Sequence, residues 1–173
     1  MSYHVSRIPA ELRSMLAADP DLADRIVRTF APRPETSTVT NPAVLRDVVA
    51  PYLVGREEEA LVCVALDRRR RVVDVAVLTV GSAGYTIVDP AQVYRWALTR
   101  KRPVNAVALA HNHPSGDPTP SPQDVDVTAR VASAGRALGI PLLDHLVVTD
   151  DDHVSLAERG HCPSVVGGTY IAA

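Results

Sequence analysis

Mainly apolar runs at residues 60–66, 104–110 and 142–149 constrain the fold of this chain more than any other feature. Short apolar runs of this kind are typical of strands that are buried on both faces of a sheet. Residues 72–80 follow the first run after a turn at 67–71, so these two strands are expected to form a hairpin. Strands buried on both faces need helices above and below the sheet to cover them.

Helical patterns lie before the first expected strand, at residues 42–53, and between later ones, at residues 90–98 and 122–138. Each begins with proline, which favours the first position of a helix, and Gly139 ends the last one. Further short strands are expected at residues 85–88 and 154–156. This order of elements predicts an α/β fold with a mixed central β-sheet flanked by helices.

The chain is expected to form one main domain with two short appendages. Residues 39–160 hold nearly all of these elements, whereas residues 1–38 are interpreted as a helical arm and linker, and residues 161–173 as a loose tail. At 173 residues, with a hydrophobic fraction of 46%, the chain is long enough to bury a core without the support of disulfides or a structural metal. The arm is expected to pack on the domain or on a second copy, so a homodimer stays open.

Cysteine usage and hydropathy predict a cytoplasmic protein. Cys63 lies inside an apolar run and is interpreted as a small core residue, and no Cys-x-x-Cys pair exists that could form a cysteine-based zinc site. The sequence shows no apolar segment of the kind found in signal peptides, and no run near the ~18 apolar residues of a membrane span. A net charge of −2 is not that of a dedicated nucleic-acid binder.

A pair of histidines at the end of an apolar strand carries the main chemical signal. Residues two apart in extended backbone point to the same side, so His111 and His113 can converge on one ion. Asp124 follows in the first turn of the next helix, from which its carboxylate can point back to the strand end. Two imidazoles and a carboxylate, with a fourth position left for water, are typical of a catalytic zinc site.

Such a site also needs a general base near the water that the metal activates. Glu59 directly precedes the first apolar strand, which fixes its position better than those of its neighbours Glu57 and Glu58. Ser121 is interpreted as a hydrogen-bond donor to the attacked carbonyl. Ser121 and Asp124 also have an equally good structural interpretation as the capping box of the helix.

These residues resemble a known family. Glu59, the segment His111-Asn112-His113-Pro114 and the segment Ser121-Pro122-Gln123-Asp124 match the JAMM pattern. Residues 110–121, with Asp124, Thr128 and the later Leu143-Asp144-His145, resemble RadC proteins. The resemblance implies a JAB/MPN architecture (cytidine-deaminase-like, with three layers), one Zn²⁺ per chain, and a hydrolase related to isopeptidases that remove ubiquitin-like modifiers. The expected substrate is a protein or peptide, including a ubiquitin-like conjugate.

Other functions stay open beside this one. RadC proteins usually carry a helix-hairpin-helix module, and residues 1–38 lack its Gly-x-Gly hairpin, so DNA binding is not carried over. Arg68–Arg71 is interpreted as a solvated hairpin tip that, with residues 100–102, could instead meet nucleic acid or an acidic partner. A non-catalytic MPN scaffold is the remaining alternative. Asp144 and His145 are interpreted as a buried, hydrogen-bonded pair, with orientation of the site as the other possibility.

Overall fold

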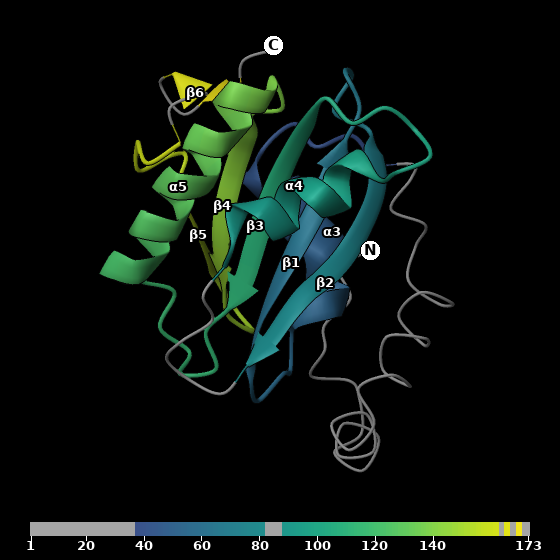
Figure 1. The fold of residues 1–173 in the computed structure, drawn as a ribbon. Coiled ribbons are helices and arrows are strands. Elements are labelled where there is room, and N and C mark those ends of the chain that lie inside the picture. The colour runs from purple at the N-terminus through teal and green to yellow at the C-terminus, as the bar shows by residue number, and fades with distance from the viewer. Residues whose placement is uncertain (1–36, 82–87, 163–164, 167–168, 171–173) are drawn as a thin grey trace.

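The computed structural model describes residues 37–81, 88–162, 165–166 and 169–170 of the chain. Its main feature is a five-stranded sheet in the order β2-β1-β3-β4-β5 (Figure 1). The strands are β1 (Glu59–Leu66), β2 (Val72–Gly81), β3 (Ala106–Asn112), β4 (Leu142–Val148) and β5 (His153–Ser155). Only β3 and β4 pair in parallel, and the other neighbours are antiparallel, so the sheet is mixed, as predicted.

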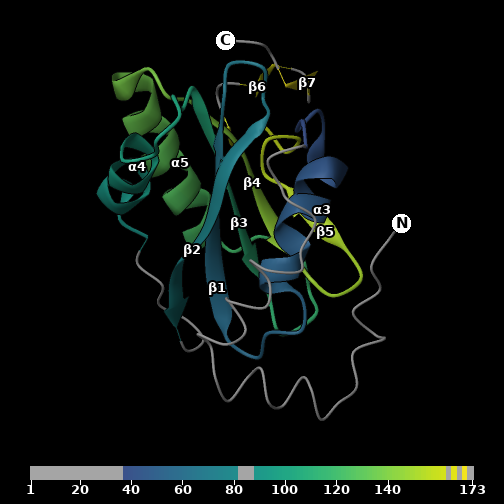
Figure 2. The same ribbon diagram turned by 90° about the vertical axis from the view of Figure 1, so that its right-hand side faces the viewer.

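Helices cover both faces of the sheet and make three layers, which Figure 2 shows from the side. Helix α3 (Pro42–Leu53) lies on one face, and helices α4 (Pro90–Leu98) and α5 (Pro122–Leu138) lie on the other. Each face has its own apolar core: Leu45 and Val49 of α3 pack in the first, and Val93 of α4 and Val131 of α5 pack in the second. The α/β class and the JAB/MPN-like layering expected from the sequence are therefore confirmed.

The helix ends follow local signals in the sequence. Asn41 caps α3 through a hydrogen bond from the Val44 N–H, and Asp89 caps α4 in the same manner. Gly139 ends α5 with a φ of 68°, in the left-handed region that glycine adopts without strain. No helix among these described residues is long and apolar enough to cross a membrane.

Strand β3 differs from its predicted range by two residues at each end. It begins at Ala106 rather than at residue 104, and it continues through His111 and Asn112. The backbones of these two polar residues still pair with β4, opposite Val147 and Val148. The predicted hairpin at residues 60–80 is confirmed by the antiparallel pairing of β1 with β2.

Some expectations fall on residues that the structure does not describe. The arm expected at residues 1–38 lies almost wholly outside the described residues, as do residues 85–87 of one expected strand. Within the tail, β6 (Val165–Val166) pairs with β7 (Thr169–Tyr170). Cys162, just before this pair, is fully buried in the second core, as is Cys63.

Candidate metal centre

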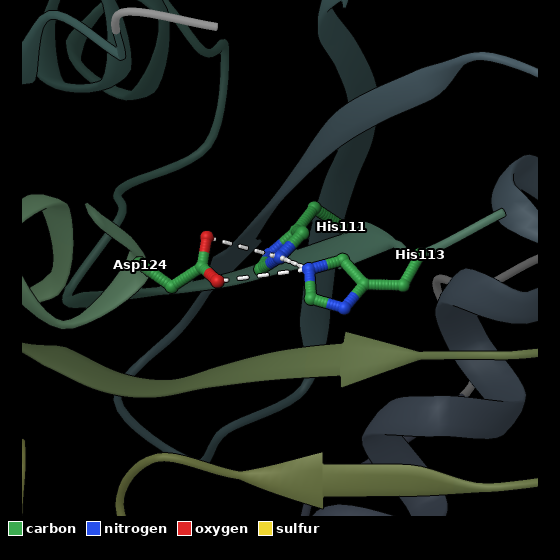
Figure 3. Close-up of side chains that lie close together, drawn as sticks. All are labelled: His111, His113 and Asp124. Carbon is green, nitrogen blue, oxygen red and sulfur yellow. Dashed lines mark hydrogen bonds and ion pairs between the residues drawn. The ribbon is translucent and has the colours of Figure 1, made fainter. Parts of the chain in front are cut away.

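The two histidines project from the end of β3 towards one point (Figure 3). Their Nε2 atoms lie 3.1 Å apart. The backbone holds both residues in place, because His111 pairs with Leu61 of β1 and the His113 N–H donates to the carbonyl oxygen of Val148 at 2.9 Å. The predicted convergence of the two imidazoles is present.

Asp124 completes the group from the first turn of α5. Its Oδ1 lies 3.2 Å from His111 Nε2, and its Oδ2 lies 3.6 Å from His113 Nε2 (Figure 3). One ligand atom from each of the three residues fits within 4.8 Å of the others. Two imidazole nitrogens and one carboxylate form the donor set of a three-ligand zinc site, so the residues present fit the metal that the sequence predicts.

Ser121 sits beside this group as the N-cap of α5. The Ser121 hydroxyl oxygen accepts a hydrogen bond from the Asp124 N–H, and the Asp124 carboxylate accepts one from the Ser121 N–H, which makes a full capping box. The hydroxyl also donates to Asp124 Oδ2 at 2.7 Å. The structural interpretation of Ser121 and Asp124 therefore holds, and the same bonds orient the carboxylate towards the histidines.

The charges of the group favour a cation at its centre. Burial alone would raise the pKa of Asp124, but the contacts of its carboxylate with the His111 and His113 rings outweigh burial and lower that pKa far below its usual range. The hydrogen bond to Asp124 raises the pKa of His113 above its ordinary value. Without a metal, the carboxylate thus favours the protonated form of His113, and a metal ion would displace that proton.

The other ring nitrogen of His113 shows which atom is free for a ligand bond. His113 Nδ1 lies 2.8 Å from the carbonyl oxygen of Asp117. A carbonyl oxygen can only accept, so Nδ1 carries the hydrogen and, in the neutral ring, Nε2 keeps its lone pair. The backbone of Asp117 thus orients the His113 ring.

Glu59 lies at the first residue of β1, beside the group. Leu61 pairs directly with His111, so these two side chains share a face of the sheet, and Glu59, two residues before Leu61, projects to that face too. The adjacent Glu58 precedes the strand and is exposed. A pocket of about 350 Å³ opens here, lined by Glu59, Ala60, Leu61, Val88, His111, His113, Ser115, Ser121, Gln123, Asp124, Val127 and His145.

Asn112 is a functional candidate that the sequence interpretation missed. Asn112 lies between the two histidines in sequence, but its side chain points away from them. Its Oδ1 accepts a hydrogen bond from the Ala60 N–H at 2.8 Å. Its Nδ2 donates to the carbonyl oxygen of Glu58 at 3.0 Å. An asparagine within a buried strand was the available signal, because a buried amide needs partners.

Asp144 and His145 are both buried and hydrogen-bonded to each other, as expected, since the His145 backbone N–H donates to Asp144 Oδ1 at 2.7 Å. Their side chains otherwise take different partners. Asp144 accepts hydrogen bonds from the Ser155 hydroxyl and the Ala157 N–H, which hold the turn after β5. The His145 ring instead contacts His111. Burial, together with His111, lowers the pKa of His145 to about 3, so its ring is neutral.

The arginine-rich segments lie at the end of β1 and the start of β3, far along the strands from the metal centre. Arg71 and Arg102 both contact Asp67, at 2.8 and 3.6 Å, and Arg100 contacts Asp74 at 2.6 Å. The fold therefore brings the hairpin tip and residues 100–102 together, with part of their charge neutralised.

Comparison with known proteins gives one consistent result. Residues 39–161 match the RadC-like JAB domain. A UPF0758 protein of Symbiobacterium thermophilum is 40% identical over 120 residues, which cover 69% of this chain and 50% of that protein. A UPF0758 protein of Shouchella clausii is 39% identical over 146 residues, or 84% of this chain and 61% of that protein. The chain thus spans about half the length of the first of these relatives.

Proposed function

Because this chain belongs to the family of RadC-like JAB domains, we propose that it is a zinc-dependent hydrolase that cleaves a peptide or isopeptide bond. The observation that carries the proposal is the convergence of His111, His113 and Asp124, whose ligand atoms lie within 4.8 Å of one another. The three residues would hold one zinc ion per chain. When bound, the ion would lower the pKa of water to about 7 and polarise the substrate carbonyl.

Glu59 is the proposed general base. It lines the same pocket as the three ligands and projects from the same face of the sheet as His111. From there its carboxylate would take a proton from the attacking water and return it to the amine that leaves. The pairing of Glu59 with Gly81 holds its backbone in place, which limits the positions that the carboxylate can take.

Ser121 is the proposed donor to the developing oxyanion. Its hydroxyl now donates to Asp124 Oδ2, so it would have to rotate towards the carbonyl of a bound substrate. The pocket offers apolar contacts from Leu61, Val88 and Val127 beside this polar cluster. The proposed substrate class is a protein or peptide, and a ubiquitin-like conjugate falls within it.

Turnover by zinc-loaded protein tests this function. The probes are a mixed peptide library and lysine-linked isopeptides, with cleavage products identified by mass spectrometry. We expect Glu59→Gln to lower the cleavage rate by about 10²–10⁴-fold while zinc stays bound, because the amide cannot accept the proton. Glu58→Gln is the matched control, since Glu58 is exposed and is not among the residues that line the pocket.

Two results would count against the proposal. Cleavage at the same rate by the wild type and Glu59→Gln would remove Glu59 from the reaction. A zinc-loaded wild type that cleaves no amide in either set of probes would favour a non-catalytic scaffold.

A further inference from the structure

Three buried side chains form a hydrogen-bonded chain that leads from the metal centre into the domain. His111 Nδ1 lies 2.8 Å from His145 Nε2, and His145 Nδ1 lies 2.7 Å from Thr128 Oγ1. The exposed fractions of His111, His145 and Thr128 are 6%, 1% and 0%. With so little access to water, each of these atoms depends on its protein partner.

The direction of each hydrogen bond follows from the last member of the chain. Thr128 Oγ1 lies 2.6 Å from the backbone carbonyl oxygen of Asp124, which can only accept, so the single hydroxyl proton points there. Thr128 must then accept from His145, and His145 carries its hydrogen on Nδ1. Because the buried ring already donates from Nδ1 to Thr128, its Nε2 is left as the acceptor for the Nδ1–H of His111.

An irregularity in β4 turns His145 to this face of the sheet. Leu142 pairs with Val107 and His145 pairs with Leu109, so three steps along β4 match two steps along β3. One extra residue in a strand reverses the alternation of side chains beyond it. Leu142 already packs in the second core, and a regular strand would have turned His145 to the first.

We propose that His145 and Thr128 are positioning residues that hold His111 in the tautomer with the hydrogen on Nδ1, which leaves Nε2 free to bind a metal. Thr128 also donates to the backbone carbonyl oxygen of Asp124. The series of hydrogen bonds therefore connects two of the three ligands, His111 on β3 and Asp124 on α5. This inference deepens the proposed function, because it rests on the same three ligands. Outer partners of this kind commonly contribute 10- to 100-fold to metal affinity.

The direct test is the tautomer of His111 in the metal-free protein, read by NMR from the ¹⁵N shifts and long-range couplings of its ring. In the wild type we expect hydrogen on Nδ1 and none on Nε2. His145→Leu removes the acceptor, so we expect the hydrogen to move to Nε2 and zinc affinity to fall by about 10- to 100-fold. His145→Gln keeps an acceptor oxygen and is expected to restore both properties in part.

A control separates positioning from stability. Leu146 follows His145 in β4 and is fully buried. It packs in the first core, on the other side of the sheet from the hydrogen-bonded residues. Leu146→Ala should destabilise the domain yet leave the His111 tautomer and the zinc affinity as in the wild type. If His145→Leu does not fold, Thr128→Val takes its place: it frees His145 Nδ1 and should shift the same tautomer, and Thr128→Ser should restore it.

The inference is overturned if His111 of the wild type carries its hydrogen on Nε2. It is also overturned if a folded His145→Leu or Thr128→Val leaves the tautomer unchanged. Because this measurement uses metal-free protein, a wild type that binds no zinc would refute the proposed function without deciding the tautomer.

Discussion

The side chain of Asn112 accepts a hydrogen bond from the backbone N–H of Ala60 at 2.8 Å, across the pairing of β3 with β1. Through its amide nitrogen it also donates to the carbonyl oxygen of Glu58. It therefore fixes the backbone on both sides of Glu59. The strand that presents the two histidines thus also places the proposed base.

Replacing Asn112 tests this relationship. We expect Asn112→Leu to lower the free energy of unfolding by about 1–3 kcal/mol, because the buried Ala60 N–H loses its acceptor. We also expect turnover to fall by up to about 10²-fold as Glu59 shifts, with zinc affinity little changed. Urea unfolding, zinc titration and turnover check these effects. The exposed Asn105, just before β3, supplies the control Asn105→Leu, and equal behaviour of the two variants would contradict the account.

Two substitutions of Ser121 distinguish capping from chemistry. Ser121→Ala should cost about 1 kcal/mol of stability, whereas glycine is tolerated at an N-cap and should cost only a few tenths. Both variants lose the hydroxyl that donates to Asp124, so we expect both to lose turnover to a similar degree. Thermal unfolding and turnover are the measurements. If Ser121→Gly turned over as fast as the wild type, the role of Ser121 would be that of a cap alone.

Gly135 of α5 is predicted to reject even a methyl group. A Cβ there would collide with the Tyr94 hydroxyl of α4 and lie 2.5 Å from the carbonyl oxygen of Ile140. Glycine to alanine within a helix ordinarily stabilises by about 0.5–1 kcal/mol, but overpacking costs about 1–3 kcal/mol, so we expect Gly135→Ala to destabilise the domain. Chemical denaturation checks the sign. Ala137→Gly, at an exposed position of α5, should lose only the helix propensity, and a stabilised Gly135→Ala would contradict the packing of α4 on α5.

The sequence predicted best what local chemistry decides. Helices α3 and α5 begin and end where expected, because local residues mark their ends. A capping residue precedes each helix, each begins with proline, and a glycine follows α5. The metal group was predicted for a similar reason: His111 and His113 are two residues apart, and Asp124 is held by a capping box that spans only residues 121–124.

Long-range pairing decided what the sequence did not predict. The partners of Asn112 lie more than fifty residues away on β1, and nothing near Asn112 in sequence identifies them. The orientation of His145 depends on one irregular step in β4, which the apolar pattern of residues 142–149 does not reveal. The extension of β3 through His111 has the same cause, because polar residues continue a strand only when neighbouring strands satisfy their backbones.

The zinc content of the full chain, purified without a histidine tag and measured by plasma mass spectrometry, tests the central claim most directly. The account predicts about one zinc ion per chain in the wild type, loss of that zinc in His113→Ala, and retention in His153→Ala, whose histidine lies on β5 outside the ligand group. Wild type and His113→Ala with the same metal content, after added zinc, would contradict the account.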